Sequence, residues 1–201
     1  MDKLNQVGDG GDNWGEFPQS PKVELLSGGR NIRLLEDFVY IDPDGRSWST
    51  PKDYEVNGAS IPQAFWSFGF GPLEGKYRDA SIVHDYACDL QSDPSDDVHL
   101  MFYYACRCGE VPEFDAKLLY MAVYWFGPSW MVKEVSSVVM KTRVDSLIQP
   151  SKSQQAIPLN VQNEATEDVI RAMKQFLTEG KRSLDEIKLW GKAYGFRPNA
   201  S

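Results

Sequence analysis

The 201-residue sequence lacks the segments that mark membrane and secreted proteins. Its longest apolar stretch, Leu118 to Trp130, is too short and too often interrupted by polar residues to span a bilayer. Residues 1–20 are polar and glycine-rich, with no apolar run typical of a signal peptide. We therefore expect no transmembrane segment and a cytoplasmic location where the protein is synthesised. Export by a route that needs no signal peptide is compatible with this pattern.

Cysteine and positive charge are also scarce. The three cysteines, an odd number, cannot all pair within the chain, which is typical of a reducing compartment. The formal net charge is -8, and acidic residues interrupt the densest basic cluster, at Lys181 and Arg182. Because a negative field repels phosphate backbones, we expect no nucleic-acid binding.

Several sequence motifs of common enzymes are missing. No Gly-Lys-Ser/Thr follows the glycines at positions 69, 71 and 75, which excludes a phosphate-binding loop of that type. No Gly-x-Ser-x-Gly occurs, which argues against a serine hydrolase built on a nucleophile elbow. Cys106 and Cys108 have no second cysteine pair, which excludes a zinc ribbon.

The residues that are present predict an α+β fold. Short β-prone runs at 23–26, 32–35 and 38–41 are separated by turn residues, and Asp42-Pro43-Asp44-Gly45 predicts a hairpin. Helical patterns follow, over 76–91, from Asp93 to about Cys108, from Pro112 to Phe126, and from Ser129 to about Ile148. We predict a small antiparallel N-terminal sheet packed on a bundle of three to four helices.

The ends of the chain differ from this main domain. We predict a flexible lead-in over residues 1–20, a main domain over 21–148, and a Pro/Ser/Gln/Asn-rich linker over 149–163. Residues 164–201 predict a helical C-terminal extension, in which Ser183 and Glu186 form a capping box. This extension either packs on the main domain or provides an interface for a protein partner or for self-association.

Six features in order, over about residues 35–130, resemble a domain-of-unknown-function family, number 1353, that is associated with phages and prophages. They are the Gly58–Pro62 turn, Trp66, Gly71-Pro72, His84-Asp85-Tyr86, a second helix, and the aromatic stretch Ala122–Gly127. The resemblance implies no settled activity. It makes association with a phage particle compatible with the sequence.

This chain departs from the family pattern at two positions. Asn57 occupies the place of the turn aspartate, and His99 occupies the place of an aspartate in the second helix, although a register shift would bring in Asp96 or Asp97. The departures imply either a different ligand set or a weakened activity.

His84 and Asp85 are the centre of the candidate site. Adjacent helical residues point about 100° apart, so His84 needs a partner from another element before it can act as a general base. The polar candidates are His99, Asp96, Asp97 and Asn57. We predict His84, Asp85 and His99 as catalytic residues, with substrate contacts from Asn57, Ser60, Tyr77 and Tyr86.

A metal site is a separate hypothesis. His84 and Cys88 are four residues apart on one predicted helix, a spacing that can chelate, and His99 lies on the next helix. Asp85 or Asp96 would be the fourth ligand, and zinc is the natural ion for such a set. We predict no firmly bound structural metal or cofactor, because His99 is also explained as an ordinary half-exposed helix residue and Cys88 as a small core residue.

Two functions remain open from the sequence. One is a hydrolase centred on His84 and Asp85, and the phage resemblance would favour cell-wall, lipid or nucleotide substrates. The other is a non-catalytic, phage-derived binding or assembly protein. In that case the His84-Asp85 pair joins helix to sheet, and the C-terminal helices carry the interface.

Overall fold

Short strands occupy the first part of the chain, and they form two antiparallel sheets. A computed structural model describes residues 13–27, 31–58, 61–71, 73–136, 152–159 and 163–196. One sheet has the order β1-β2-β5 and the other pairs β3 with β4. The strands are β1 (Val23–Leu25), β2 (Ile32–Leu34), β3 (Phe38–Ile41), β4 (Ser47–Thr50) and β5 (Glu55–Val56).

The turn between β3 and β4 confirms the predicted hairpin. The Asp42 side chain accepts hydrogen bonds from the backbone N–H groups of Asp44 and Arg46, and Gly45 adopts a φ of 82°. An aspartate at the start of such a turn and a glycine in the left-handed region are the residue types that this backbone path favours.

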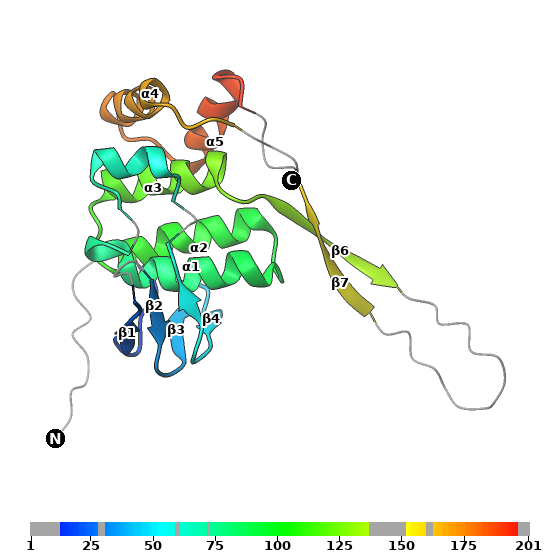
Figure 1. Ribbon diagram of the computed structural model, residues 1–201. Helices are drawn as coiled ribbons and strands as arrows, with labels where there is room; N and C mark the ends of the chain where they lie inside the picture. The colour runs from blue at the N-terminus through cyan, green and yellow to red at the C-terminus, as the bar shows by residue number, and fades with distance from the viewer. Residues whose placement is uncertain are drawn as a thin grey trace.

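The helices stack in layers above the sheets (Figure 1). Helix α1 packs on β3, β4 and β5, α2 packs on α1, and α3 packs on α2. Two short 3₁₀ helices, η1 (Gln63–Phe68) and η2 (Gly75–Tyr77), precede α1. The bounds are α1 (Arg78–Leu90), α2 (Ser95–Cys108) and α3 (Glu113–Phe126). This arrangement confirms the predicted α+β class.

The C-terminal helices cover the other side of α3. Helix α4 (Glu167–Thr178) and helix α5 (Leu184–Ala193) both contact α3, so residues 118–125 of α3 are buried all round. A helix that is apolar on every face is buried on every face. Ser183 and Glu186 form the capping box that the sequence predicts. The buried apolar residues of this layer are Val169, Ile170, Met173, Leu177 and Ile187.

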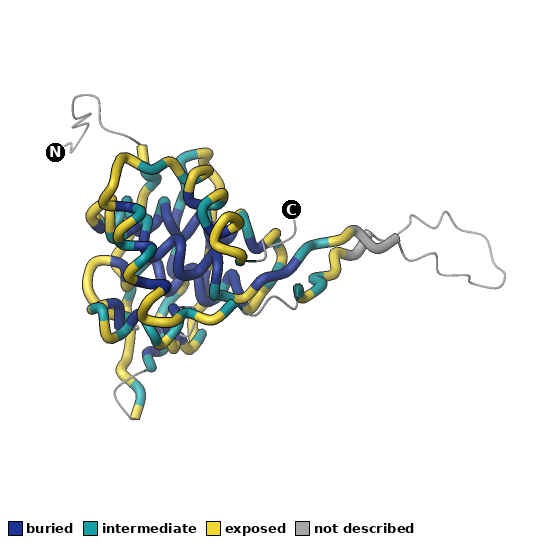
Figure 2. The backbone as a smooth tube through the Cα atoms, turned by 90° about the horizontal axis from the view of Figure 1, so that it is seen from above, coloured by how far each residue is buried: buried dark blue, intermediate teal, exposed yellow. Residues whose placement is uncertain are grey.

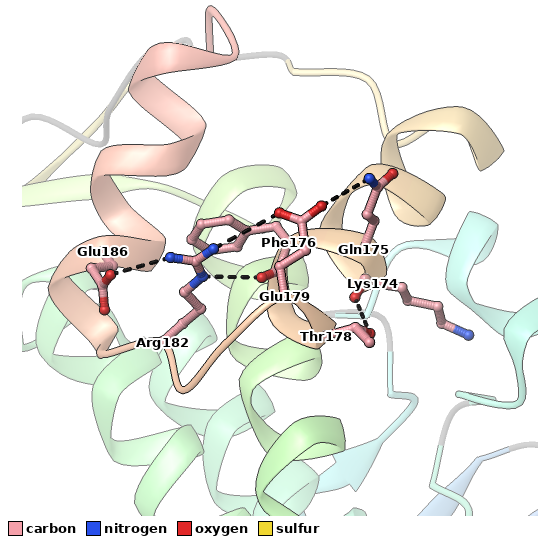
Figure 3. Close-up of polar contacts among 7 residues, drawn as sticks. All are labelled: Lys174, Gln175, Phe176, Thr178, Glu179, Arg182 and Glu186. Carbon is pink, nitrogen blue, oxygen red and sulfur yellow. Dashed lines mark hydrogen bonds and ion pairs between the residues drawn. The ribbon is translucent and has the colours of Figure 1, made fainter.

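Arg182 joins the two C-terminal helices (Figure 3). Its Nε–H donates to the Phe176 carbonyl at 3.1 Å, and its guanidinium lies 4.4 Å from the centre of the Phe176 ring. The same group forms ion pairs with Glu179 at 3.9 Å and with Glu186 at 3.5 Å. These contacts hold the turn between α4 and α5.

A β-hairpin replaces the helix predicted from residue 129. Strand β6 (Trp130–Ser136) pairs antiparallel with β7 (Lys152–Pro158), which lies inside the predicted linker. Pro128 precludes continuation of α3, and the distant partner strand supplies the backbone hydrogen bonds that a local pattern cannot reveal. The hairpin projects from the body of the molecule, whose buried residues lie in the helical layers and sheets (Figure 2). Residues 137–148 of the predicted helix lie outside the described residues.

Part of the predicted lead-in is ordered against the sheet. Glu16 forms a β-bridge with Ile41, and the Tyr40 hydroxyl donates to the Trp14 carbonyl at 2.5 Å. Phe17 stacks on Phe38 with ring centres 5.4 Å apart. Aromatic burial therefore outweighs the local glycine content at 13–17, whereas residues 1–12 lie outside the described part. None of the described helices is long and apolar enough to cross a membrane.

Candidate functional site: a buried histidine pair and a thiol

The histidines at positions 84 and 99 meet between α1 and α2. Gln91, with a φ of 51°, ends α1, and a short turn leads into α2, so the two helices pack side by side. His84 Nε2 lies 3.0 Å from His99 Nδ1. Their exposed fractions are 1% and 0%, so the pair belongs to the interior of the protein.

The acceptor beyond His99 determines which nitrogens carry protons. His99 Nε2 lies 3.0 Å from the Pro128 carbonyl oxygen, which can only accept a hydrogen bond. His99 therefore donates from Nε2 and has its lone pair on Nδ1. In the metal-free protein His84 then donates from Nε2 to that lone pair, which leaves the lone pair of His84 on Nδ1.

Cys88 completes the cluster from the next turn of α1. Its Sγ atom lies 3.7 Å from His84 Nε2 and 3.9 Å from His84 Nδ1. One ligand atom from each of His84, Cys88 and His99 lies within 4.8 Å of the other two. Cys88 is 6% exposed, so all three side chains are buried. The structure thus brings together three of the five residues named as metal-ligand candidates.

Burial keeps both imidazoles neutral. It lowers the pKa of His84 well below its ordinary value of 6.5, and the neighbouring His99 lowers that pKa further. Burial also lowers the pKa of His99 to about 4, against the opposing effect of the Pro128 carbonyl. The Phe102 ring, 4.5 Å from the His84 ring, forms an apolar wall of this site. Desolvation disfavours the charged form of an imidazole, which explains the direction of both shifts.

Asp85 hydrogen-bonds to a different part of the fold, the turn after β5. Its Oδ2 accepts a hydrogen bond of 2.7 Å from the backbone N–H of Gly58, in a buried contact between α1 and the turn after β5. Gly58 adopts a φ of 65°, a conformation that glycine tolerates best. This bond runs to the backbone and not to an imidazole, so it gives no support to Asp85 as the group that orients His84. The orienting contacts of the pair come from His99 and Pro128.

The acidic residues at the start of α2 have partners other than the histidines. Asp96 hydrogen-bonds to the Tyr124 hydroxyl, and burial raises the Asp96 pKa despite the opposing charge of Lys188. Asp97 lines a hollow of about 240 Å³ together with residues of the β3–β4 hairpin. Asp96 is therefore not among the grouped ligands, and the Pro128 carbonyl, not Asp96 or Asp97, is the acceptor for His99.

The residues predicted to contact substrate are dispersed. Tyr77 is buried, and its hydroxyl donates to the Gly71 carbonyl at 2.6 Å. Tyr86 is half-buried and packs edge-on against Tyr54 at 5.0 Å. Asn57 is exposed beside Gly58, and Ser60 lies outside the described residues. Tyr77 therefore has a packing role within the fold, and only Asn57 lies next to the segment that Asp85 anchors.

Pro128 belongs to the site, but sequence reasoning did not predict it. Its carbonyl reaches His99 from 29 residues further along the chain, and a backbone oxygen leaves no trace in residue type. The Gly127-Pro128 break after α3 is the only signal of an irregular backbone at this point.

Comparison with known proteins finds relatives whose names state no function. The chain is 40% identical over 122 residues to "Uncharacterized protein y4jT" of Sinorhizobium fredii (strain NBRC 101917 / NGR234), covering 60% of this chain and 36% of that relative. It is 37% identical over 106 residues to "Uncharacterized protein y4iH" of the same organism, covering 52% of this chain and 44% of that relative. The chain thus spans less than half the length of either relative. No solved structure matches it significantly.

A family model described as "Protein of unknown function (DUF1353)" matches residues 32–123. The matched segment contains β2 to β5 and α1, α2 and most of α3, together with His84, Cys88 and His99. The β6–β7 hairpin and the C-terminal helices lie outside it. The segment from residue 32 to residue 123 therefore belongs to the family of proteins of unknown function numbered 1353, as the order of its motifs predicts.

Proposed function

We propose that this domain is a hydrolase whose reaction centre is the cluster of His84, His99 and Cys88. The observation that carries the proposal is the direct contact between the only two imidazoles of the chain, 3.0 Å apart and buried, with a thiol beside them. Buried titratable groups that contact one another are frequent at reaction centres, since the same contacts tune their reactivity.

The hydrogen-bond order of the cluster supports a role for His84 as a general base. The Pro128 carbonyl orients His99, and His99 holds the His84 ring, which leaves the lone pair of His84 on Nδ1, 3.9 Å from Cys88 Sγ. That nitrogen would take a proton from a water molecule or from the Cys88 thiol during attack on the substrate. The variant Cys88→Ser distinguishes the two nucleophiles, because it removes attack by the thiol and leaves attack by water possible.

Asp85 is a positioning residue in this proposal. Its bond to Gly58 anchors the turn after β5 against α1, beside the helix face that carries His84 and Cys88. Since all three cluster residues are buried, substrate would enter only when a covering segment moves. Asn57 precedes Gly58 in that turn and keeps its proposed place at the mouth of the site, whereas Ser60 lies outside the described residues.

The test uses the full-length protein and the variant His84→Gln, which keeps a neutral polar side chain of similar size. Chromogenic acyl and phosphodiester esters, peptidoglycan and phospholipid vesicles cover the proposed substrate classes. We expect turnover to fall by about a hundredfold or more, with little change in Tm. The buried thiol variant Cys106→Ser on α2 is the control. Full turnover in His84→Gln, or its loss of folding, would show that the imidazole is structural.

The second candidate function is a non-catalytic binding or assembly role. Three observations favour it. Asp85 joins helix to turn through a buried bond, and the β6–β7 hairpin projects from the body (Figure 2). Helix α5 also leaves Leu189 62% exposed, on the segment proposed as an interface. Light scattering of the wild type and of Leu189→Lys tests it. An oligomer that the substitution dissociates, together with no turnover, would favour assembly over hydrolysis.

A further inference from the structure

The buried cluster has the composition and spacing of a transition-metal site. We propose that His84 Nε2, His99 Nδ1 and Cys88 Sγ bind one zinc ion and leave a fourth coordination position open. As an account of water activation the inference rests on the proposed hydrolysis and replaces the base role of His84 Nδ1, which would carry a proton once zinc binds. Metal binding itself is measured without any turnover.

Two of the three distances between the ligand atoms are close to what one ion requires. A tetrahedral zinc ion with bonds of about 2.0 Å to nitrogen and about 2.3 Å to sulfur places its nitrogens roughly 3.3 Å apart and its sulfur roughly 3.5 Å from each nitrogen. The corresponding nitrogens here are 3.0 Å apart, and Sγ lies 3.7 Å from His84 Nε2. Shifts of a few tenths of an ångström would therefore bring His84 and its two neighbours to these separations, and the ligand atoms of Cys88 and His99 lie within 4.8 Å of each other.

The contact beyond His99 is the one that metal-binding histidines usually make. A ligating imidazole commonly donates its other N–H to a carbonyl or carboxylate, which fixes the ring and its tautomer. His99 donates from Nε2 to the Pro128 carbonyl at 3.0 Å, so its Nδ1 lone pair is directed at the place where the ion would bind. This arrangement orients His99 before any metal arrives.

Zinc binding would change the tautomer of His84 and release one proton from Cys88. The proton that His84 Nε2 shares with His99 would move to His84 Nδ1, so this ring stays neutral and only changes tautomer. The Cys88 thiol would lose its proton to solvent and bind as thiolate. One zinc ion thus replaces one proton, and the buried site gains a single positive charge.

The donor set selects the kind of metal. Two imidazoles and a thiolate suit zinc and related transition ions, whereas magnesium and calcium require oxygen ligands. The nearby carboxylates of Asp85 and Asp96 bond to Gly58 and Tyr124 instead. Three protein ligands with an open fourth position are typical of zinc sites that bind a water molecule and lower its pKa.

The first experiment measures metal in the full-length protein. Protein purified without chelator is analysed for zinc, and protein stripped of metal is titrated with zinc and with cobalt(II). We expect one equivalent of either ion, and a thiolate-to-cobalt charge-transfer band in the near ultraviolet. A folded wild type that binds less than about a tenth of an equivalent and gives no such band would overturn the inference, whatever the variants do.

Variants then assign the ligands. His84→Gln and His99→Gln should each weaken zinc binding by a hundredfold or more, and Cys88→Ser should remove the charge-transfer band while circular dichroism shows retained helices. Cys106→Ser, a buried thiol on the same helix as His99, should keep both the ion and the band. Loss of the band in folded Cys106→Ser, with its retention in Cys88→Ser, would assign the metal to another site.

Measurements of turnover distinguish the zinc site from the proposed hydrolase activity. Zinc bound by His84 and His99 without turnover on any substrate would support the metal site and contradict the hydrolase. Turnover that persists in zinc-free protein would support hydrolysis at the cluster and contradict the metal as its means of activating water.

Discussion

The carboxylate of Asp85 accepts a hydrogen bond from the backbone N–H of Gly58 across 2.7 Å, although 27 residues separate them. The contact is buried and joins the turn after β5 to the middle of α1. It is one of the contacts that fix the helix carrying His84 and Cys88 to the sheet side of the molecule.

Removing the Asp85 carboxylate should destabilise the fold. In Asp85→Ala the Gly58 N–H loses this acceptor, and we expect the free energy of unfolding to fall by about 1–3 kcal/mol. Asp85→Asn keeps a side-chain oxygen that can accept the same bond, so its loss should be roughly half as large. Urea unfolding followed by circular dichroism measures both. Equal losses below about 0.5 kcal/mol in both variants would contradict the anchoring role.

The stability of the metal-free protein should depend on pH through His99. Its pKa of about 4 lies below the ordinary 6.5, so the unfolded chain binds a proton first as the pH falls. The contribution of the neutral His99 to the free energy of unfolding is fully present above about pH 6.5. It falls by on the order of 3 kcal/mol as the pH falls to about 4. Urea unfolding across that window, in protein freed of metal, should show a steeper decline in wild type than in His99→Gln. Identical slopes would mean that the native histidine titrates normally.

Helix α5 should be sensitive to a single added methyl group. A side chain at Gly191 would overlap the indole ring of Trp125, which is 2% exposed. We expect Gly191→Ala to cost about 1–3 kcal/mol by overpacking and to lower Tm by several degrees. Gly180→Ala is the matched control, since a Cβ there would meet only the end of Arg182 at 3.9 Å. Hydrogen exchange should be faster in α5 of the first variant alone. Similar Tm values for the two variants would argue against close packing of α5.

Arg182 should contribute more to stability than a typical surface arginine. Arg182→Ala removes the bond to the Phe176 carbonyl and two ion pairs, so we expect a loss of about 1–2 kcal/mol. Arg171→Ala removes ion pairs only within α4, with Glu167 and Asp168, and should cost less than about 0.5 kcal/mol. Thermal unfolding compares the two. A larger effect at Arg171 would contradict the role of Arg182 as the connection between α4 and α5.

The local pattern of the sequence determines much of this protein. The Asp-Pro-Asp-Gly turn, the capping box at Ser183 and Glu186, and the spacing of the first three α-helices each depend on neighbouring residues, and each appears where it is predicted. Turns and caps are short-range hydrogen bonds, which explains why sequence reasoning finds them. The same holds for the approach of Cys88 to His84, because one helical turn separates them.

Contacts between distant segments were decided by the tertiary structure alone. Strand β6 exists because β7, 22 residues after its start, supplies its hydrogen-bond partners, and a local helical pattern over 129–148 could not reveal that pairing. Asp85 and Asp96 are carboxylates near the histidines in sequence, but the packing of α1 and α2 turns them toward Gly58 and Tyr124. The sequence by itself determined which residue types the centre contains. Only the packing of α1 against α2, with the Pro128 carbonyl behind His99, decided which of them meet, because burial leaves each polar atom the partners that the fold brings to it.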